Sequence, residues 1–189
     1  MIVAVLGAPG SFSETAARRL AGRGAWIRSV DTFDALFDVV ASSGADCGVV
    51  PVHNTLAGPV GDNATRTRDH AFRVIGATHL EVQQCLIARP GTRLDTVRRV
   101  ASHPVALRQC RRFFAGRPWC VPVPIGDTAT GVRNLVSGRQ DADAVIGSAA
   151  AARRYRASVL LECVQDAPGN FTEFVMFERA SAPPPPERR

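Results

Sequence analysis

Residues 2–17 read Ile-Val-Ala-Val-Leu-Gly-Ala-Pro-Gly-Ser-Phe-Ser-Glu-Thr-Ala-Ala, and this stretch decides the class of fold. The continuous apolar run Ile2–Leu6 is typical of a strand covered on both faces of a parallel sheet. The turn Gly7–Gly10 follows, and then Ser11 and Glu14 have the spacing of a helix capping box. A buried strand, a glycine turn and a capped helix in this order predict an α/β protein.

The turn and helix start also present backbone N–H groups and serine hydroxyls where an anion can bind. Ser11, Phe12 and Ser13 are therefore candidate substrate-binding residues, although the same residues also suit a capped helix with a purely structural role. The turn contains no lysine and no complete GxGxxG, which excludes a Walker A loop and a dinucleotide-binding fingerprint. We expect neither a cofactor nor a metal.

Strands and helices alternate along the rest of the chain, as in parallel sheets with helical crossovers. Strands are expected at residues 25–30, 47–52, 72–80, 82–88, 121–124, 142–146, 159–164 and 171–177, and helices at 32–40, 105–115, 131–137 and 148–155. Crossings near residues 80 and 157 predict two lobes with mostly parallel sheets and a cleft between them. The single domain 1–180 would then divide into a first lobe of about 1–78 plus 158–180, a second lobe of about 79–157, and a disordered tail at 181–189.

Composition restricts the class of partner. The 189 residues carry a net charge of +6, which favours anionic partners, but the chain has no recognition element for nucleic acid. Its five cysteines form no CxxC pair and are expected to be buried in a reducing cytosol. The N-terminal apolar run lacks a basic flank, and no apolar run approaches membrane-spanning length. We therefore expect a cytoplasmic protein that binds no membrane.

Four motifs along the chain, GAPGSFSETAA, PVHNTLAGPV, SHPVALRQC and GNFTEFVMF, together resemble the prephenate dehydratase family. They occur in the family's order and span about the whole chain. The resemblance implies a two-lobed fold like that of type II periplasmic binding proteins, with the site in the cleft between the lobes. It also implies prephenate, a dianion, as the substrate, and an oligomer, which we expect to be a homodimer.

The resemblance carries specific site residues with it. Thr172 keeps the family's hydroxyl and is expected to be catalytic, while Asn54 and Thr55 match its substrate-binding pair. Phe174 shares a face with Thr172 by strand alternation and is expected to line the cleft. Capped helix starts add further candidate donors to the substrate carboxylates, namely Ser102, His103 and Thr128.

Three positions depart from the family pattern. His53 replaces a glutamate, Glu173 replaces an arginine, and Gln84 replaces a histidine that often precedes the Cys-Leu-Leu strand. We also expect the usual regulatory ACT domain to be absent. The smaller group of prephenate decarboxylases of secondary metabolism resembles dehydratases with an altered site and no ACT domain, so we expect non-aromatising decarboxylation with the ring hydroxyl retained. His53 would then act with Thr172, since histidine can donate a proton near neutral pH, and Glu173 and Gln84 would set specificity.

Other interpretations remain open. His53 is equally well explained as a structural residue, and Glu173 as one member of an exchanged surface pair. The second enzymatic interpretation is a prephenate dehydratase that forms phenylpyruvate for phenylalanine biosynthesis. The third is a binding module without catalysis that keeps the cleft for a small anion.

Overall fold

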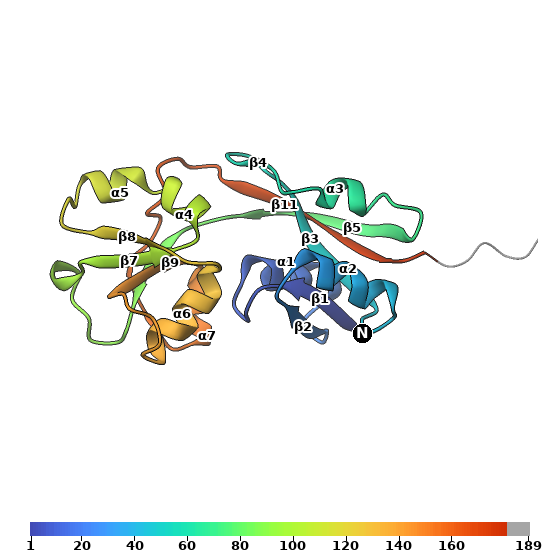
Figure 1. Cartoon of the computed structure of the whole chain (residues 1–189), viewed down its shortest axis with the longest axis horizontal. Coiled ribbons are helices and arrows are strands. Elements are labelled where there is room, and N and C mark those ends of the chain that lie inside the picture. Colours follow the sequence, from blue (N-terminus) through green and yellow to red (C-terminus); the bar gives the residue numbers. More distant parts are fainter. Residues whose placement is uncertain (181–189) are drawn as a thin grey trace, which may run out of the picture.

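The computed structural model describes residues 1–180, which form two lobes that are each built around one sheet (Figure 1). The expected tail at 181–189 lies outside the described residues. The first sheet has the order β2-β1-β3-β11-β5, with β4 beside β3. Its strands are β1 (Ile2–Leu6), β2 (Trp26–Val30), β3 (Cys47–Asn54), β4 (Gly58–Pro59), β5 (Phe72–Glu81) and β11 (Phe171–Arg179), and its helices are α1 (Phe12–Ala21), α2 (Phe33–Ala41) and α3 (Asn63–Arg66).

The second sheet has the order β10-β6-β9-β7-β8. Its strands are β6 (Cys85–Ala88), β7 (Arg99–Ser102), β8 (Val121–Pro124), β9 (Ala144–Gly147) and β10 (Ser158–Leu161). Its helices are α4 (Pro104–Arg108), α5 (Arg111–Ala115), α6 (Thr128–Val136) and α7 (Ala149–Arg154), with the 3-10 turn η1 (Leu94–Thr96). The predicted two-lobed α/β fold is confirmed.

The direction of the strands differs from the prediction of mostly parallel sheets. Only the β1–β2, β1–β3, β7–β8 and β7–β9 pairs are parallel, and every other pair is antiparallel. Both sheets are therefore mixed. Apart from the short β4, which turns back beside β3, the antiparallel strands are β5, β6, β10 and β11. These four strands lead to and from the two crossings between the lobes, so the crossings impose the reversal.

The second crossing lies later in the chain than expected. β5 stays in the first sheet as far as Glu81, and β10 pairs with β6 in the second sheet. The chain therefore returns to the first lobe between β10 and β11, and residues 158–161 belong to the second lobe.

The helix expected at 105–115 is broken into α4 and α5. At the break, the Asp166 carboxylate accepts hydrogen bonds from the backbone N–H groups of Arg111 (2.9 Å) and Arg112 (2.7 Å). This carboxylate satisfies the unpaired N–H groups at the start of α5, which gives the second crossing a fixed attachment to the second lobe.

Helices cover both faces of the first sheet. Val3 and Val5 of β1 pack under α1, whereas Ala4 packs with Leu36 under α2, so β1 is buried on both sides as its apolar run predicts. The ring of Phe177 stacks on Phe37 with 4.8 Å between centroids. Within residues 1–180, no helix has both the length and the apolar character that crossing a membrane requires.

Four of the five cysteines are buried, as predicted, but Cys163 is exposed. Burial raises the pKa of the Cys110 thiol to about 12, with a smaller contribution from the negative charge of Asp166. The buried thiols are thus held in the neutral, unreactive form.

Candidate active site

Thr172 and Asn54 meet where the first sheet approaches the second lobe. They are paired directly across β11 and β3, and each is 7% exposed. Asn54 Nδ2 donates a hydrogen bond of 2.9 Å to Thr172 Oγ1. Because Oγ1 accepts this bond, the hydroxyl proton of Thr172 remains available for donation to another group.

The other polar atoms of Asn54 are used inside the protein. Its Nδ2 also donates to Asn170 Oδ1 (2.7 Å) and to the carbonyl of Phe171 (3.1 Å). Its Oδ1 accepts from the backbone N–H groups of Leu56 (3.1 Å) and Ala57 (2.9 Å). A primary amide has two protons and two acceptor lone pairs, and all are occupied here. The expectation that Asn54 binds the substrate directly does not fit this geometry, which makes it an orienting residue for the β11 hydroxyl.

Thr55 also forms hydrogen bonds within the protein. Its Oγ1 donates to the carbonyl of Gly169 (3.0 Å) and accepts from the N–H of Phe171 (2.9 Å). The backbone N–H of Thr55 also donates to the carbonyl of Phe171 (2.9 Å). These bonds fasten the loop after β3 to the start of β11.

Asn170 extends this network into the second lobe. It is 1% exposed, and its Nδ2 donates to the carbonyl of Val82 (3.3 Å) and to Oε1 of Gln109 (3.2 Å) at the end of α4. Asn170 and Gln109 were absent from the residues expected to form the site. Asn170 lies in the motif GNFTEFVMF, and Gln109 lies in the motif SHPVALRQC. Their place in these motifs is the sequence signal by which they could have been identified as site residues. A row of amides thus links Gln109 to Thr172 across both lobes.

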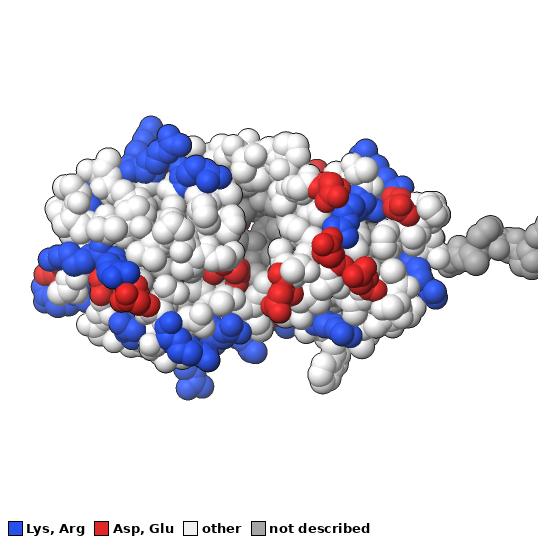
Figure 2. All heavy atoms as spheres, in the orientation of Figure 1, with Lys and Arg blue, Asp and Glu red and all other residues white. Residues whose placement is uncertain are grey.

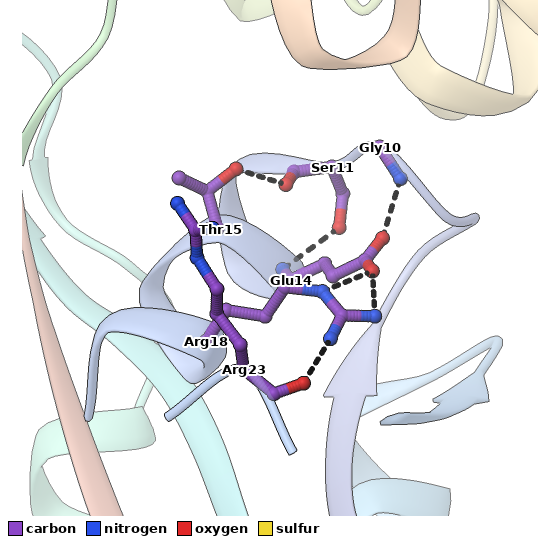
Figure 3. Close-up of polar contacts among 6 residues, drawn as sticks. All are labelled: Gly10, Ser11, Glu14, Thr15, Arg18 and Arg23. Atoms are coloured by element: carbon purple, nitrogen blue, oxygen red, sulfur yellow. Dashed lines mark hydrogen bonds and ion pairs between the residues drawn. The ribbon is translucent and has the colours of Figure 1, made fainter. Parts of the chain in front are cut away.

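The turn before α1 presents a second group of polar atoms at the junction between the lobes. Ser11 Oγ accepts from the N–H of Glu14 (3.1 Å), and Glu14 Oε2 accepts from the N–H of Gly10 (2.6 Å), as Figure 3 shows. The predicted capping box is therefore present in a variant form, because Glu14 binds the N–H of Gly10, the residue before the N-cap, and the N–H of Ser11 donates to the carbonyl of Ala8. Phe12 and Ser13 follow at the start of α1, both half-buried.

This turn contacts the second lobe. Ser148 Oγ, which caps α7, donates a hydrogen bond of 2.7 Å to the carbonyl of Gly10. Asp127 caps α6 through the N–H of Thr130 (2.7 Å), and Thr128 is the first residue of that helix. The starts of α1, α6 and α7 therefore converge between the lobes, where Figure 2 shows a narrow hollow. Helix N-termini carry partial positive charge, so this arrangement suits an anionic ligand.

Ser102 and His103, two of the expected helix-start residues, form different hydrogen bonds. Ser102 is fully buried, and its Oγ donates to the carbonyl of Ile146 (2.7 Å), so it cannot contact a substrate as expected. His103 caps α4, with Nδ1 accepting from the N–H of Val105 (3.2 Å), as predicted for a helix-start residue.

Phe174 does not line the cleft. It is 2% exposed and packs in the core with Val3, Val5 and Met176 beneath α1. Strand alternation does place Phe174 on the face of Thr172. The expectation fails because α1 covers that face one residue pair further along β11.

His53 and Glu173 are direct cross-strand partners in β3 and β11, and His79 of β5 is the partner of Glu173 on its other side. Directly paired residues project from the same face, and successive residues of a strand project from opposite faces. His53, Glu173 and His79 therefore share the face opposite Thr172. The expected cooperation of His53 with Thr172 on one substrate is contradicted by this register.

Gln84 lies in the first crossing and is 4% exposed. Its N–H donates to Gln165 Oε1 (2.9 Å), and its carbonyl accepts from the N–H of Val164 (2.9 Å), which joins the two crossings. Its side-chain Oε1 is buried and has no hydrogen-bond partner within residues 1–180.

Comparisons with known proteins agree with this architecture. A protein-family model described as prephenate dehydratase matches residues 3–182. Arogenate dehydratase 4, chloroplastic, of Arabidopsis thaliana is 35% identical over 187 residues, which cover 98% of this chain and 44% of that protein. The chain thus spans less than half the length of this relative.

Two solved structures share the fold. The structure of prephenate dehydratase from Arthrobacter aurescens in complex with L-Phe superposes with a TM-score of 0.88 at 26% identity, covering 100% of this chain and 63% of that one. The structure of GqqA, described as a novel type of quorum quenching acylase, gives a TM-score of 0.84 at 30% identity, with 98% and 67% covered. With its family model matched along almost its whole length, the chain belongs to the prephenate dehydratase family.

Proposed function

We propose that this protein is a carbon–oxygen lyase that converts prephenate to phenylpyruvate, with loss of CO₂ and water. The observation that carries the proposal is the hydrogen bond from Asn54 to Thr172 Oγ1, because it leaves the hydroxyl proton free to reach a substrate. Membership of the prephenate dehydratase family supports the same substrate.

The reaction requires mainly hydrogen-bond donors that are positioned beside the reacting groups of the substrate. The bond from the ring to its carboxylate breaks, its electron pair enters the ring, and the bond to the ring hydroxyl breaks at the opposite carbon. The departing oxygen takes up a proton and leaves as water. Thr172 donates a hydrogen bond to that oxygen, and Asn54 Nδ2 stabilises the negative charge that develops on Oγ1.

The substrate carboxylates require anion sites between the lobes. The starts of α1 and α6 supply them, and Ser13 and Thr128 in the first turns of these helices add side-chain hydroxyl donors. Such dipolar sites hold a carboxylate without the strong charge stabilisation of a buried arginine, and this weaker hold favours the departure of CO₂.

The structure supports dehydration over the non-aromatising decarboxylation expected from the sequence. That expectation depended on His53, Glu173, Gln84 and the expected absence of a regulatory domain, and the first two of these residues lie on the face opposite Thr172. His53 and Glu173 are cross-strand partners. The acidic residue of the pair stands at position 173 here, whereas in the family pattern it stands at the position of His53. We infer an exchange within one surface pair, which leaves the reaction unchanged.

The test is to incubate the protein with prephenate, and separately with arogenate, and to follow products by ultraviolet absorbance and mass. Phenylpyruvate is the expected product of prephenate. Thr172→Val should lower kcat by about 10²-fold or more, the usual contribution of a proton donor, whereas Thr172→Ser should keep most of it. A product that has lost CO₂ but kept its hydroxyl would establish the decarboxylase instead. Unchanged substrates would leave a binding module.

A further inference from the structure

A second pocket, of about 380 Å³, lies between the lobes beside the turn that carries Ser11. The first lobe contributes Pro9, part of α1, the loop after α1 and the start of β2, and the second lobe contributes Arg154 at the end of α7. This volume is within the range of small-ligand sites. The proposed reaction does not involve this pocket.

Positive charge dominates its lining. Arg18, Arg23 and Arg154 line the pocket against a single carboxylate, Glu14, which pairs with Arg18 at 2.7 Å (Figure 3). The guanidinium groups of Arg23 and Arg154 make no hydrogen bond or ion pair with any residue of the described part of the chain. Two uncommitted guanidinium groups, one from each lobe, suit a carboxylate placed between them.

An aromatic surface adjoins these arginines. Trp26, the first residue of the edge strand β2, lines the pocket and is 78% exposed. An indole ring this exposed offers a flat apolar face for a ligand ring. We propose that this pocket binds a small aromatic carboxylate, with its charge between Arg23 and Arg154 and its ring against Trp26.

A ligand there would contact both sides of the junction between the lobes. Pro9 adjoins Gly10, whose carbonyl accepts from Ser148 and whose N–H donates to Glu14. Arg154 ends the helix that Ser148 caps. A ligand bound there would therefore hold residues of both lobes together next to the turn that carries Ser11.

Fluorescence tests the proposal without any enzymatic activity, so its outcome is separate from that of the proposed reaction. The chain has two tryptophans, and Trp119→Phe leaves Trp26 as the only one. Titration of this variant with benzoate should change its emission saturably. Adding Arg23→Gln and Arg154→Gln should weaken the apparent affinity at least tenfold. The matched control, Arg139→Gln with Arg153→Gln, removes the same charge outside the pocket and should leave the affinity unchanged.

Several results would overturn the proposal. A linear response to benzoate, or equal affinity in the pocket and control variants, would show that these arginines bind no carboxylate. Equal binding of uncharged benzyl alcohol would remove the role of charge, and equally tight binding of inorganic phosphate would remove the role of the ring. If the emission of Trp26 changed with the concentration of the protein and not with that of benzoate, the surface around Trp26 would instead bind a second copy of the chain.

Discussion

Replacement of Asn170 by alanine should damage both stability and catalysis, because this buried amide joins the two lobes at the site. The substitution removes three side-chain hydrogen bonds, to Asn54, Val82 and Gln109. Each contributes on the order of 1 kcal/mol net, so we expect a loss of about 3 kcal/mol in the free energy of unfolding. Typical domains have only about 5–15 kcal/mol in total.

Activity should fall for a different reason. Without Asn170, the amide of Asn54 loses its shortest acceptor, at 2.7 Å, and is held less firmly against Thr172. Each 1.4 kcal/mol lost from the transition state costs about tenfold in rate, so we expect kcat to fall by roughly 10-fold to 100-fold. KM should change much less, because the anion sites at the helix starts remain.

The assay combines urea unfolding with prephenate turnover at urea concentrations where the variant is fully folded. Asn63→Ala is the matched control. Asn63 is also fully buried, and its amide bonds the carbonyl of Pro51 (2.9 Å), but it lies outside the network. It should lose stability and keep its kcat. Wild-type kcat in folded Asn170→Ala, or an equal loss of kcat in both variants, would refute the role assigned to Asn170.

Four further predictions test other parts of the structure. Gly10→Ala would place a Cβ 2.7 Å from the α7 backbone at a φ of +90°, so it should separate the lobes, increase the radius of gyration in X-ray scattering and lower activity. His53→Glu with Glu173→Arg should leave the prephenate product unchanged, and a different product would show that this face governs the reaction. A thiol reagent should modify Cys163 alone in the native protein, and more than one thiol modified before unfolding would contradict the observed burial. Since burial raises the pKa of Cys110 to about 12, the thiol's contribution to stability is complete below the unfolded-state pKa near 9 and should decline as the pH rises towards 12, as measured by urea unfolding.

Local sequence determined the elements of this protein. The apolar run of β1, the capping box of α1 and the caps of α2, α6 and α7 depend on residues within a few positions of each other. The four motifs likewise carried the family resemblance, because each is a short continuous stretch. Propensity and capping act over such distances, so the sequence contains their full cause.

Only the tertiary structure determined which residues come together in the candidate active site. Asn54 is separated from Asn170 and Thr172 by 116 and 118 residues, and β-strand pairing brings them together. The same pairing places His53 with Glu173 on the opposite face, after an irregularity in β3 that shifts the register by one residue. A shift of one residue exchanges the two faces of a strand. No local pattern encodes that register, so the chemistry expected of His53 could be judged only in the folded chain.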